Sequence, residues 1–277
     1  MVKEHIFGIF PCLGALQANK RKIYKLITKD AFLKKSILSK SDKIAFMIDV
    51  AKERDLKVDF KEKAYIDKLV GSRPHQNIVM QVSHLTHEKL DINKMKNTSN
   101  EWMEDKHFQK QLWIALDQVQ DPMNFGAVLR SAAYFGVEGI IATAKNSCRL
   151  SPTVSKASAG AMEWMKIHSS ENLSANLKEL ACNGWDVIGT TMPCKEYTDS
   201  SDVMPCAQLV LEKPTVLVLG NEGYGVSGDV IDACTKLTTI DSTASINDMD
   251  SLNVAVAAGI LINRLMTNDQ NAFIKGR

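Results

Sequence analysis

The chain has 277 residues, of which 45% are apolar and 24% are charged. These values are typical of a globular protein with a buried core, and the absence of any run of about 18 apolar residues excludes a membrane-spanning helix. The six cysteines form no CxxC pair, which argues against a structural zinc site and favours reduced thiols. We therefore expect neither a metal site nor a membrane partner.

The small net charge of +2 hides an uneven distribution along the chain. Residues 1–110 carry a net charge of +8 and residues 111–277 a net charge of −6, with nine basic and two acidic residues between Asn19 and Lys43. Phosphate contacts are mainly electrostatic, so this density favours a polyanion as a partner, although lysines also solvate ordinary surfaces. The residues predicted to bind this polyanion are Lys20, Arg21, Lys22 and Lys25.

The pattern of residues 1–82 predicts a small α/β domain. Apolar residues at helical spacing predict one helix that begins at Ser41 and another that Gly71 ends. The expected helices cover 7–19, a stretch from residue 41, and 61–70, and the expected strands cover 22–28, 56–60 and 77–82. The polar residues 83–110 are interpreted as a linker or surface insertion.

Residues 111–277 predict a second α/β domain. Its expected strands are nearly continuous apolar runs with helical stretches between them, which is typical of a parallel sheet covered on both faces. These strands are expected at 112–116, 137–143, 185–190, 215–219 and 237–240. Ligands of such sheets bind beyond the carboxyl ends of the strands, and three segments of chemical interest follow strands here.

The first segment, residues 117–136, contains Asp121-Pro122, which breaks the strand. Asn124 is expected to cap the following helix. Arg130 lies outside the apolar stripe of that helix and within reach of the strand ends. A solvent-facing arginine is the alternative interpretation.

The second segment, residues 216–230, is a strand that runs into a glycine-rich loop. The order GxxGxG differs from the dinucleotide fingerprint GxGxxG, and the loop lacks the GK[ST] of a P-loop. Glu222 would repel a phosphate, which favours a neutral or cationic ligand and disfavours a nicotinamide cofactor. S-adenosylmethionine, a sulfonium cation without phosphates, fits this pattern, and a plain tight turn is the alternative.

In the third segment, residues 240–262, a strand ends at Ile240 and a polar loop follows. Ser251 or a neighbour is expected to cap a helix rich in small residues that another helix can approach closely. A simple packing helix is the alternative, but it does not account for the second polar residue, Asn253, beside the cap.

The stretches DPMNFGAVLRSAAYFG, VLGNEGYGVS and SLNVAVAAGIL, with SPTVSKASAGAMEW after the first, resemble the SpoU branch of the SPOUT RNA methyltransferases over residues 112–265. The first domain resembles the family's ribosomal-protein-like substrate-binding domain. Its stretches HIFGIFPCLGALQANKRKIYKL and RPHQNIVMQVS are similar to those of mitochondrial large-subunit rRNA guanosine 2′-O-methyltransferases. The resemblance implies a trefoil knot in the sheet domain and a homodimer with its active site at the interface.

The resemblance also implies an S-adenosylmethionine-dependent enzyme that methylates a ribose 2′-hydroxyl in rRNA. A tRNA or another rRNA site is an alternative substrate, and an inactive RNA-binding assembly factor is an alternative of another class. The implied catalytic residues are Asn124, Arg130, Glu222, Ser251 and Asn253, and the implied cofactor-binding residues are Gly220, Ile240, Leu252 and Thr190. The resemblance implies a mitochondrial location, although the N-terminal residues show no clear transit peptide.

Three positions depart from the family pattern. Asp241 follows Ile240, where many relatives have proline, and the loop from there to Ser251 is longer. Asn77 stands where relatives often have glycine. The family assigns the general base to the position of Arg130, but a guanidinium holds its proton at a pKa above about 12, so a phosphate clamp is the other role considered for this residue.

Overall fold

The computed structural model consists of two compact units, each described here by itself. The first unit contains residues 1–86 together with 149–164, and the second contains residues 87–148 and 165–277. The sequence prediction placed residues 149–164 within a continuous domain 111–277. Their place in the first unit is a difference from that prediction. The structure describes residues 3–29, 41–96, 111–192, 203–242 and 251–267.

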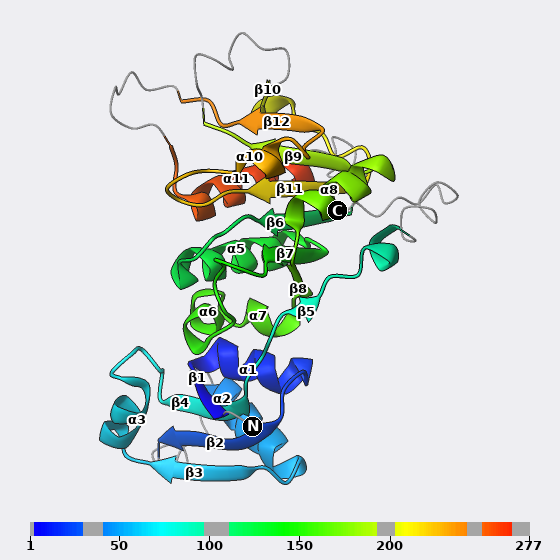
Figure 1. Cartoon of the computed structure of the whole chain (residues 1–277). Helices are drawn as coiled ribbons and strands as arrows, with labels where there is room; N and C mark the ends of the chain where they lie inside the picture. Colours follow the sequence, from blue (N-terminus) through cyan, green and yellow to red (C-terminus); the bar gives the residue numbers. More distant parts are fainter. Residues whose placement is uncertain (1–2, 30–40, 97–110, 193–202, 243–250, 268–277) are drawn as a thin grey trace, which may run out of the picture. The chain divides into compact units, whose positions relative to one another are not determined.

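A four-stranded sheet forms the centre of the first unit (Figure 1). Its strand order is β1-β4-β2-β3, in which β4 is antiparallel to both of its neighbours and β3 is parallel to β2. The strands are β1 (Lys3–Phe7), β2 (Ile23–Lys29), β3 (Lys57–Lys61) and β4 (Ile78–Ser83). The helices are α1 (Ile9–Ala18), α2 (Ser41–Glu53), α3 (Lys63–Val70), α6 (Pro152–Ala157) and α7 (Ala161–Trp164).

Alternating side chains of this sheet build two apolar cores. Ile6, Leu26 and Met80 pack with α1 and α2 on one face. Phe7 and Ile27 pack with α3 on the other face. This alternation is the period of two expected of a strand between two apolar layers.

The second unit is built on an eight-stranded sheet in which every neighbouring pair of described strands is parallel. The strand order is β10-β12-β9-β11-β6-β7-β8-β5. The strands are β5 (Glu88–Lys89), β6 (Leu112–Leu116), β7 (Gly139–Thr143), β8 (Ile167–Ser170), β9 (Asp186–Thr190), β10 (Val203–Pro205), β11 (Thr215–Leu219) and β12 (Lys236–Thr239). The helices are α5 (Pro122–Phe135), α8 (Leu173–Cys182), α10 (Gly228–Ile231) and α11 (Val254–Thr267), with a 3-10 turn, η2 (Cys206–Gln208).

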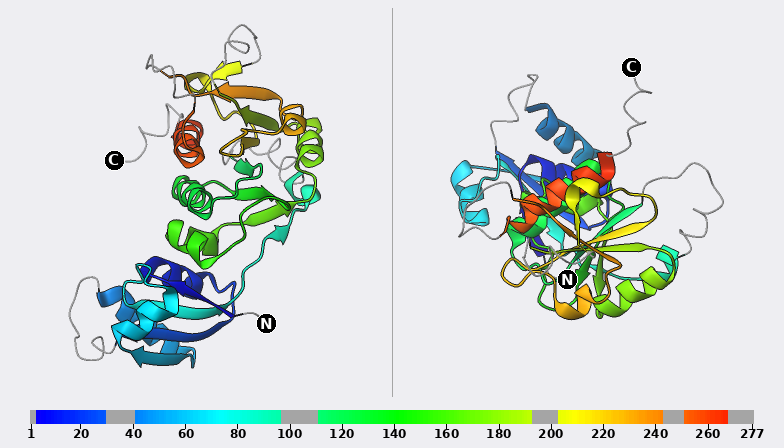
Figure 2. Two further views of the ribbon diagram at one scale, coloured as in Figure 1. Left: turned by 60° about the vertical axis from the view of Figure 1, so that its left-hand side comes forward. Right: turned by 90° about the horizontal axis from the view of Figure 1, so that it is seen from above.

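Helices cover both faces of this parallel sheet. The helices α5 and α11 contact each other on one face, and α8 and α10 contact each other on the opposite face (Figure 2). The core beneath α8 and α10 includes Trp113, Trp185 and Val216, all nearly inaccessible to water. The predicted parallel sheet with helices on both faces is therefore confirmed.

Four short strands differ from the sequence prediction. Residues 3–7 form β1, whereas the predicted helix began at residue 7, and β5, β8 and β10 were not predicted. Residues 88–89 were part of the expected linker, but they add the edge strand β5 to the larger sheet, and Met95 is buried in its core. Such strands are hard to predict from the sequence, because a short strand need not show a continuous apolar pattern.

The five cysteines in the described part of the chain form no disulfide with one another. Burial raises the pKa of Cys148 to about 11 and the pKa of Cys234 to about 12, so both are poor nucleophiles. Among the described residues, no group of three metal-ligating side chains forms a metal site, and no helix is long and apolar enough to cross a membrane.

The departure at Asn77 has a backbone explanation. Asn77 has a φ of 60°, in the left-handed region that glycine and asparagine tolerate best. Its carbonyl accepts a hydrogen bond from Thr28 Oγ1 at 3.0 Å, and its amide donates to His75 Nδ1 at 3.0 Å. The left-handed conformation at this position is thus one that both glycine and asparagine adopt.

We predict that Asn77→Gly changes the free energy of unfolding by less than about 0.5 kcal/mol, because relief of the left-handed strain offsets the greater freedom of the unfolded chain. Asn77→Val should destabilise the protein by about 1–3 kcal/mol, since a β-branched side chain resists this conformation. Chemical unfolding of the two variants measures both values. Equal losses for glycine and valine would contradict the backbone explanation.

Candidate active site

Four adjacent parallel strands bring the loops of interest to one edge of the larger sheet. The strands β12, β9, β11 and β6 are neighbours in that order, so their carboxyl ends share an edge. The chain leaves that edge through residues 240–242, 191–192, 220–227 and 117–121, respectively. This edge is where open α/β sheets bind ligands.

The helix α5 begins directly after β6 and is capped by Asp121. The Asp121 carboxylate accepts a hydrogen bond from the backbone amide of Asn124 at 2.9 Å, and Pro122 occupies the first helical turn. The prediction that Asn124 caps this helix was wrong, because Asn124 supplies the amide and not the acceptor. Its side chain is thereby left for other contacts.

The loop after β11 closes on itself and is anchored to the loop after β6. The backbones of Asn221 and Gly225 exchange two hydrogen bonds of 2.9 Å. The Asn221 side chain donates to Gln118 O at 2.8 Å. The buried Asp117 carboxylate accepts from Ser227 N at 2.8 Å and from Ser227 Oγ at 2.6 Å. These contacts fix the loop in one conformation.

Gly220 is required by the close approach of the loop's two sides. A Cβ atom at Gly220 would lie 2.1 Å from the carbonyl carbon of Gly225 and 2.2 Å from the amide nitrogen of Val226. Both contacts are with backbone, which cannot turn away as a side chain can. Any larger residue at this position must therefore displace the loop.

A cavity of about 480 Å³ opens between α11 and the loops that follow β9, β11 and β12. Every residue predicted to bind the cofactor lines it, and so do the predicted catalytic residues Glu222 and Ser251. Other lining residues include Leu219, Val226, Val254 and Leu261, which give the cavity an apolar part. The cofactor-binding residues predicted from the sequence are Thr190, Gly220, Ile240 and Leu252.

The charge of this cavity is negative. Glu222 and Asp241 are its only ionisable acidic side chains among the described lining residues, and none of those lining residues is lysine, arginine or histidine. A ligand with phosphate groups would meet uncompensated carboxylates, whereas a cationic ligand would be attracted. The sequence prediction of a neutral or cationic ligand, which was based on Glu222, is therefore supported by a second carboxylate, that of Asp241.

Three of the predicted catalytic side chains form a hydrogen-bonded chain beside the cavity. Asn253 Nδ2 donates to Asn124 Oδ1 at 3.0 Å, and Asn124 Nδ2 donates to Glu222 Oε1 at 2.9 Å. Asn253 Oδ1 also accepts from the amide of Ala255 at 2.9 Å, so Asn253 stabilises the start of α11. The chain joins the beginnings of α5 and α11 to the glycine loop.

Arg130, like Asn124 and Asn253, does not line the cavity, and it takes no part in the hydrogen-bonded chain. It lies on an exposed position of α5, and no hydrogen bond or ion pair joins it to another residue in the described part of the chain. An exposed guanidinium on α5 is accessible to a ligand that arrives from solvent.

The residues predicted to bind RNA lie in the first unit in different environments. Lys22 is exposed, with its ammonium 5.6 Å from the ring centroid of Tyr24. Lys20 donates to the carbonyl of Trp164 at 3.2 Å, and Lys25 pairs with Asp59 at 3.2 Å. Arg21 is buried with its side chain fully inaccessible, so the structure does not fit the prediction that Arg21 contacts RNA.

Asp117, Asp121 and Asn221 organise the site but were not singled out as site residues. The pair Asp121-Pro122 carries the sequence pattern of a helix N-terminus, since aspartate is a common N-cap and proline a common first residue. No sequence pattern identifies Asp117 or Asn221, because their partners lie about a hundred residues away.

Two family models match the chain. Residues 111–263 match the model described as the SpoU rRNA Methylase family, and residues 5–87 match the model described as RNA 2′-O ribose methyltransferase substrate binding.

Curated relatives match along most of the chain. The chain is 39% identical over 271 residues to "rRNA methyltransferase 1, mitochondrial" of Homo sapiens, with 95% of this chain and 72% of the relative covered. It is 29% identical over 280 residues to the protein of the same name from Schizosaccharomyces pombe, with 95% of this chain and 89% of the relative covered.

Solved structures share the fold. The structure described as an AdoMet-bound rRNA methyltransferase from Sinorhizobium meliloti matches with a TM-score of 0.68 and 19% identity, over 95% of this chain and 86% of that one. A TrmH-family protein from Porphyromonas gingivalis matches with a TM-score of 0.63 and 22% identity, over 96% of this chain and 90% of that one. These likenesses confirm the predicted α/β methyltransferase fold with a preceding substrate-binding domain.

Proposed function

Because the chain belongs to the SpoU rRNA methylase family, we propose that it transfers a methyl group from S-adenosylmethionine to a ribose 2′-hydroxyl of rRNA. The observation that carries this proposal is the acidic cavity at the carboxyl edge, bordered by the hydrogen-bonded chain of Asn253, Asn124 and Glu222. The cavity suits a cationic cofactor, and the chain of polar side chains suits a ribose.

The residues of the cavity fit S-adenosylmethionine in both shape and charge. Apolar side chains such as Ile240 and Leu252 supply a surface for an adenine ring, and Thr190 supplies a hydroxyl. The carboxylates of Glu222 and Asp241 favour a sulfonium and an ammonium group. When bound, this cofactor supplies a methyl group on a positively charged sulfur, which is a good leaving group.

The protein must then align the ribose oxygen with the methyl group and accept the hydroxyl proton. Alignment of this kind contributes about 7–11 kcal/mol to lowering a barrier. Asn124 and Asn253 are held by each other and can orient the ribose, and Glu222 fixes Asn124 from the cavity side. Ser251, at the cavity edge, offers a further hydroxyl for the same purpose.

Arg130 is assigned to the substrate side of the reaction. It either accepts the proton of the 2′-hydroxyl, as the family resemblance implies, or clamps the adjacent phosphate through its planar fork. Removal of a general base typically costs about 10²–10⁴-fold in rate. Both roles require an arginine whose guanidinium is not already bound by another residue of the protein. Within the described part of the chain, Arg130 makes no hydrogen bond or ion pair.

More specifically, the proposed target nucleotide is a guanosine in the peptidyl-transferase region of the large-subunit rRNA in mitochondria. The names of the human and yeast relatives support an rRNA substrate and a mitochondrial location, and the first domain belongs to a family described as substrate binding. The positive charge of residues 1–110 supports the first domain as the RNA-holding part, through exposed residues such as Lys22 and with Lys20 and Lys25 nearby.

We also propose that two copies of the chain form a homodimer through the face made by α5 and α11. These paired helices leave apolar side chains exposed: Met123 (58%) and Tyr134 (83%) on α5, and Val256 (51%) and Ile260 (38%) on α11. Exposed apolar groups of this size favour an interface. The trefoil knot stays a prediction from the family resemblance.

The activity is tested with purified protein, methyl-labelled S-adenosylmethionine and an unmodified large-subunit rRNA transcript from the source organism. We expect label in one 2′-O-methylguanosine after digestion to nucleosides. Label on a base would contradict the proposed reaction, label only in tRNA would favour a tRNA substrate, and RNA binding without any transfer would favour an inactive assembly factor.

Gly220→Ala should weaken binding of S-adenosylhomocysteine by about tenfold or more, a loss of about 1.4 kcal/mol, because the new Cβ displaces the loop. Gly228→Ala is the matched control, since a Cβ at Gly228 meets nothing within 4 Å. Titration calorimetry measures both variants. Unchanged binding by Gly220→Ala would place the cofactor elsewhere.

Arg130→Ala should reduce methyl transfer by at least about 100-fold and leave S-adenosylhomocysteine affinity unchanged. Arg130→Lys should also be poor, because an ammonium cannot reproduce the planar fork of donors. Single-turnover rates of wild type and Arg130→Ala across a pH series separate the two roles, since loss of a base changes the slope of the rate against pH, whereas loss of a clamp lowers the rate by the same factor at each pH. Normal turnover by Arg130→Ala would remove the residue from the mechanism.

Sedimentation of the protein should give twice the chain mass of 30.7 kDa. Val256→Glu should shift the protein to the monomer, because a buried unpaired carboxylate at an interface is costly. Lys178→Glu, on the exposed side of α8, is the control and should stay dimeric. A monomeric wild type, or a dimeric Val256→Glu variant, would contradict this interface.

A further inference from the structure

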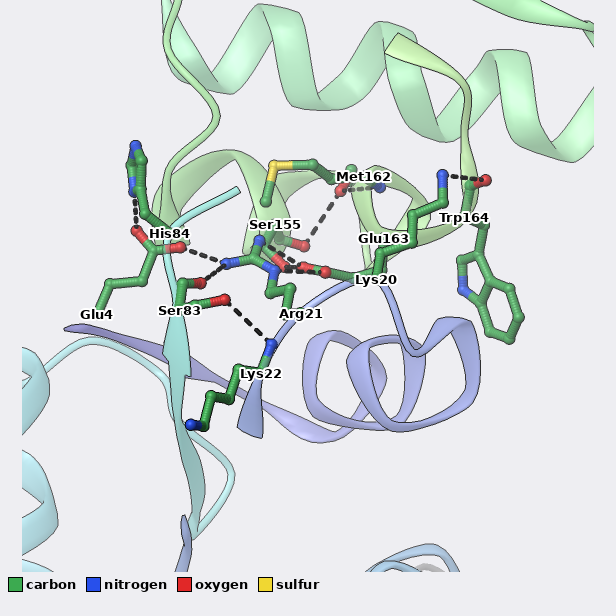
Figure 3. Close-up of polar contacts among 11 residues, drawn as sticks. Glu4, Lys20, Arg21, Lys22, Ser83, His84, Ser155, Met162, Glu163 and Trp164 are labelled. Carbon is green, nitrogen blue, oxygen red and sulfur yellow. Dashed lines mark hydrogen bonds and ion pairs between the residues drawn. The ribbon is translucent and has the colours of Figure 1, made fainter. Parts of the chain in front are cut away.

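The first unit contains a buried ionic cluster that the proposed reaction does not use. At its centre, the guanidinium of Arg21 and the carboxylate of Glu163 lie side by side with both side chains 0% exposed (Figure 3). Arg21 follows α1 in the substrate-binding domain, whereas Glu163 lies in α7, within the matched methylase segment. The pair therefore joins two stretches of chain that are 142 residues apart.

The geometry of this pair is a bidentate fork. Arg21 Nε donates to Glu163 Oε2 at 2.7 Å, and Arg21 Nη2 donates to Glu163 Oε1 at 2.9 Å. Paired hydrogen bonds of this kind fix the relative orientation of the two groups as well as their distance. A lysine cannot form the same arrangement.

The remaining donors of Arg21 are also occupied. Its Nη1 atom donates to the Glu4 carboxylate and to the carbonyl of Ser83 at 3.2 Å. Ser155 Oγ donates to Glu163 Oε1 at 3.0 Å, so the carboxylate is bound from both sides. With these contacts in place, the guanidinium has no exposed face left for an RNA phosphate.

The cluster depends on Arg21 for its charge balance. Two carboxylates, Glu4 and Glu163, face this single guanidinium, and His84 Nδ1 lies 2.9 Å from the outer oxygen of Glu4. Burial raises the pKa of Glu163, while Arg21 and Ser155 oppose that rise. Loss of Arg21 would leave a buried carboxylate without a counter-charge, which strongly disfavours the docked arrangement.

Glycine packing around the cluster indicates the same docked contact without any charge. A Cβ atom at Gly160 would lie 2.6 Å from the carbonyl oxygen of Phe10, and one at Gly14 would lie 3.1 Å from the carbonyl oxygen of Gly160. Helix α1 thus meets the chain at Gly160, directly before α7, backbone to backbone, and α1 also contacts α7. Residues 160–164 are therefore held against α1 by close backbone packing as well as by the Arg21–Glu163 ion pair.

We propose that Arg21 is a positioning residue that docks residues 149–164 of the methylase segment onto the RNA-binding domain, and that methylation of rRNA depends on this docking. The inference rests on the proposed function. Residues 149–164 are continuous at both ends with strands β7 and β8, so the docked segment connects the RNA-holding domain to the catalytic sheet through the chain itself. Arg21 thus acts on the rate of transfer and not on the affinity for RNA.

The test measures RNA affinity as a function of salt, S-adenosylhomocysteine affinity, and the single-turnover rate at saturating rRNA transcript. For Arg21→Gln and Glu163→Gln in the full-length protein, we expect RNA affinity within about twofold of wild type and an unchanged salt slope. The saturating rate should fall by about 10- to 100-fold, as a small misplacement of substrate can produce. Lys22→Gln removes an exposed charge, so we expect it to lower RNA affinity and to make the salt slope shallower.

Gly160→Ala tests the docking without changing a charge. The control is Gly184→Ala, because both glycines have a φ of +84° but a Cβ at Gly184 meets nothing within 4 Å. We expect the reduced rate, and faster amide exchange in residues 152–164, for Gly160→Ala only. This pair decides the question even if Arg21→Gln does not fold.

A weaker RNA affinity and a shallower salt slope for Arg21→Gln, with a normal saturating rate, would overturn the proposal and make Arg21 an RNA contact. Normal rates for both Glu163→Gln and Gly160→Ala would also overturn it. Failure of the proposed function gives a different result, since the wild-type protein would then neither bind S-adenosylhomocysteine nor methylate the transcript.

Discussion

The site depends on the parallel pairing of β6, β11, β9 and β12, because this pairing places four carboxyl ends at one edge of a sheet. Separate segments between residues 190 and 261 thereby supply one cavity. Each pairing is stabilised by apolar burial on both faces of the sheet, so the helices that cover these faces also set the position of the loops. Asn124 and Asn253 lie at the beginnings of two such helices, and their hydrogen bond is a consequence of that packing.

Most of the fold could be predicted from the sequence, since the central strands are short apolar runs between helical patterns. The strands β1, β5, β8 and β10 could not, because they are short, and β1, β5 and β8 also carry polar residues. The membership of residues 149–164 in the first unit was also beyond prediction. It depends on Arg21 and on Gly160, whose partners are remote in the sequence and follow no periodic pattern.

The site, like the fold, could be predicted from the sequence only in part. The cofactor-binding residues were inferred from a family resemblance, and the structure brings Gly220, Ile240 and Leu252 to one cavity. The capping role predicted for Asn124 was wrong because Asp121 occupies the N-cap position, although aspartate and asparagine are comparable caps. Arg21 was grouped with its basic neighbours because a count of charges does not distinguish an exposed lysine from a buried, paired arginine.

The most direct test of the proposed function is a map of ribose 2′-O-methylation across all rRNA and tRNA in cells with and without the protein, complemented with wild type or with Arg130→Ala. The account predicts that one guanosine of the large-subunit rRNA loses its methyl group, that wild type restores it, and that Arg130→Ala does not. An unchanged rRNA map, or restoration by Arg130→Ala, would contradict it.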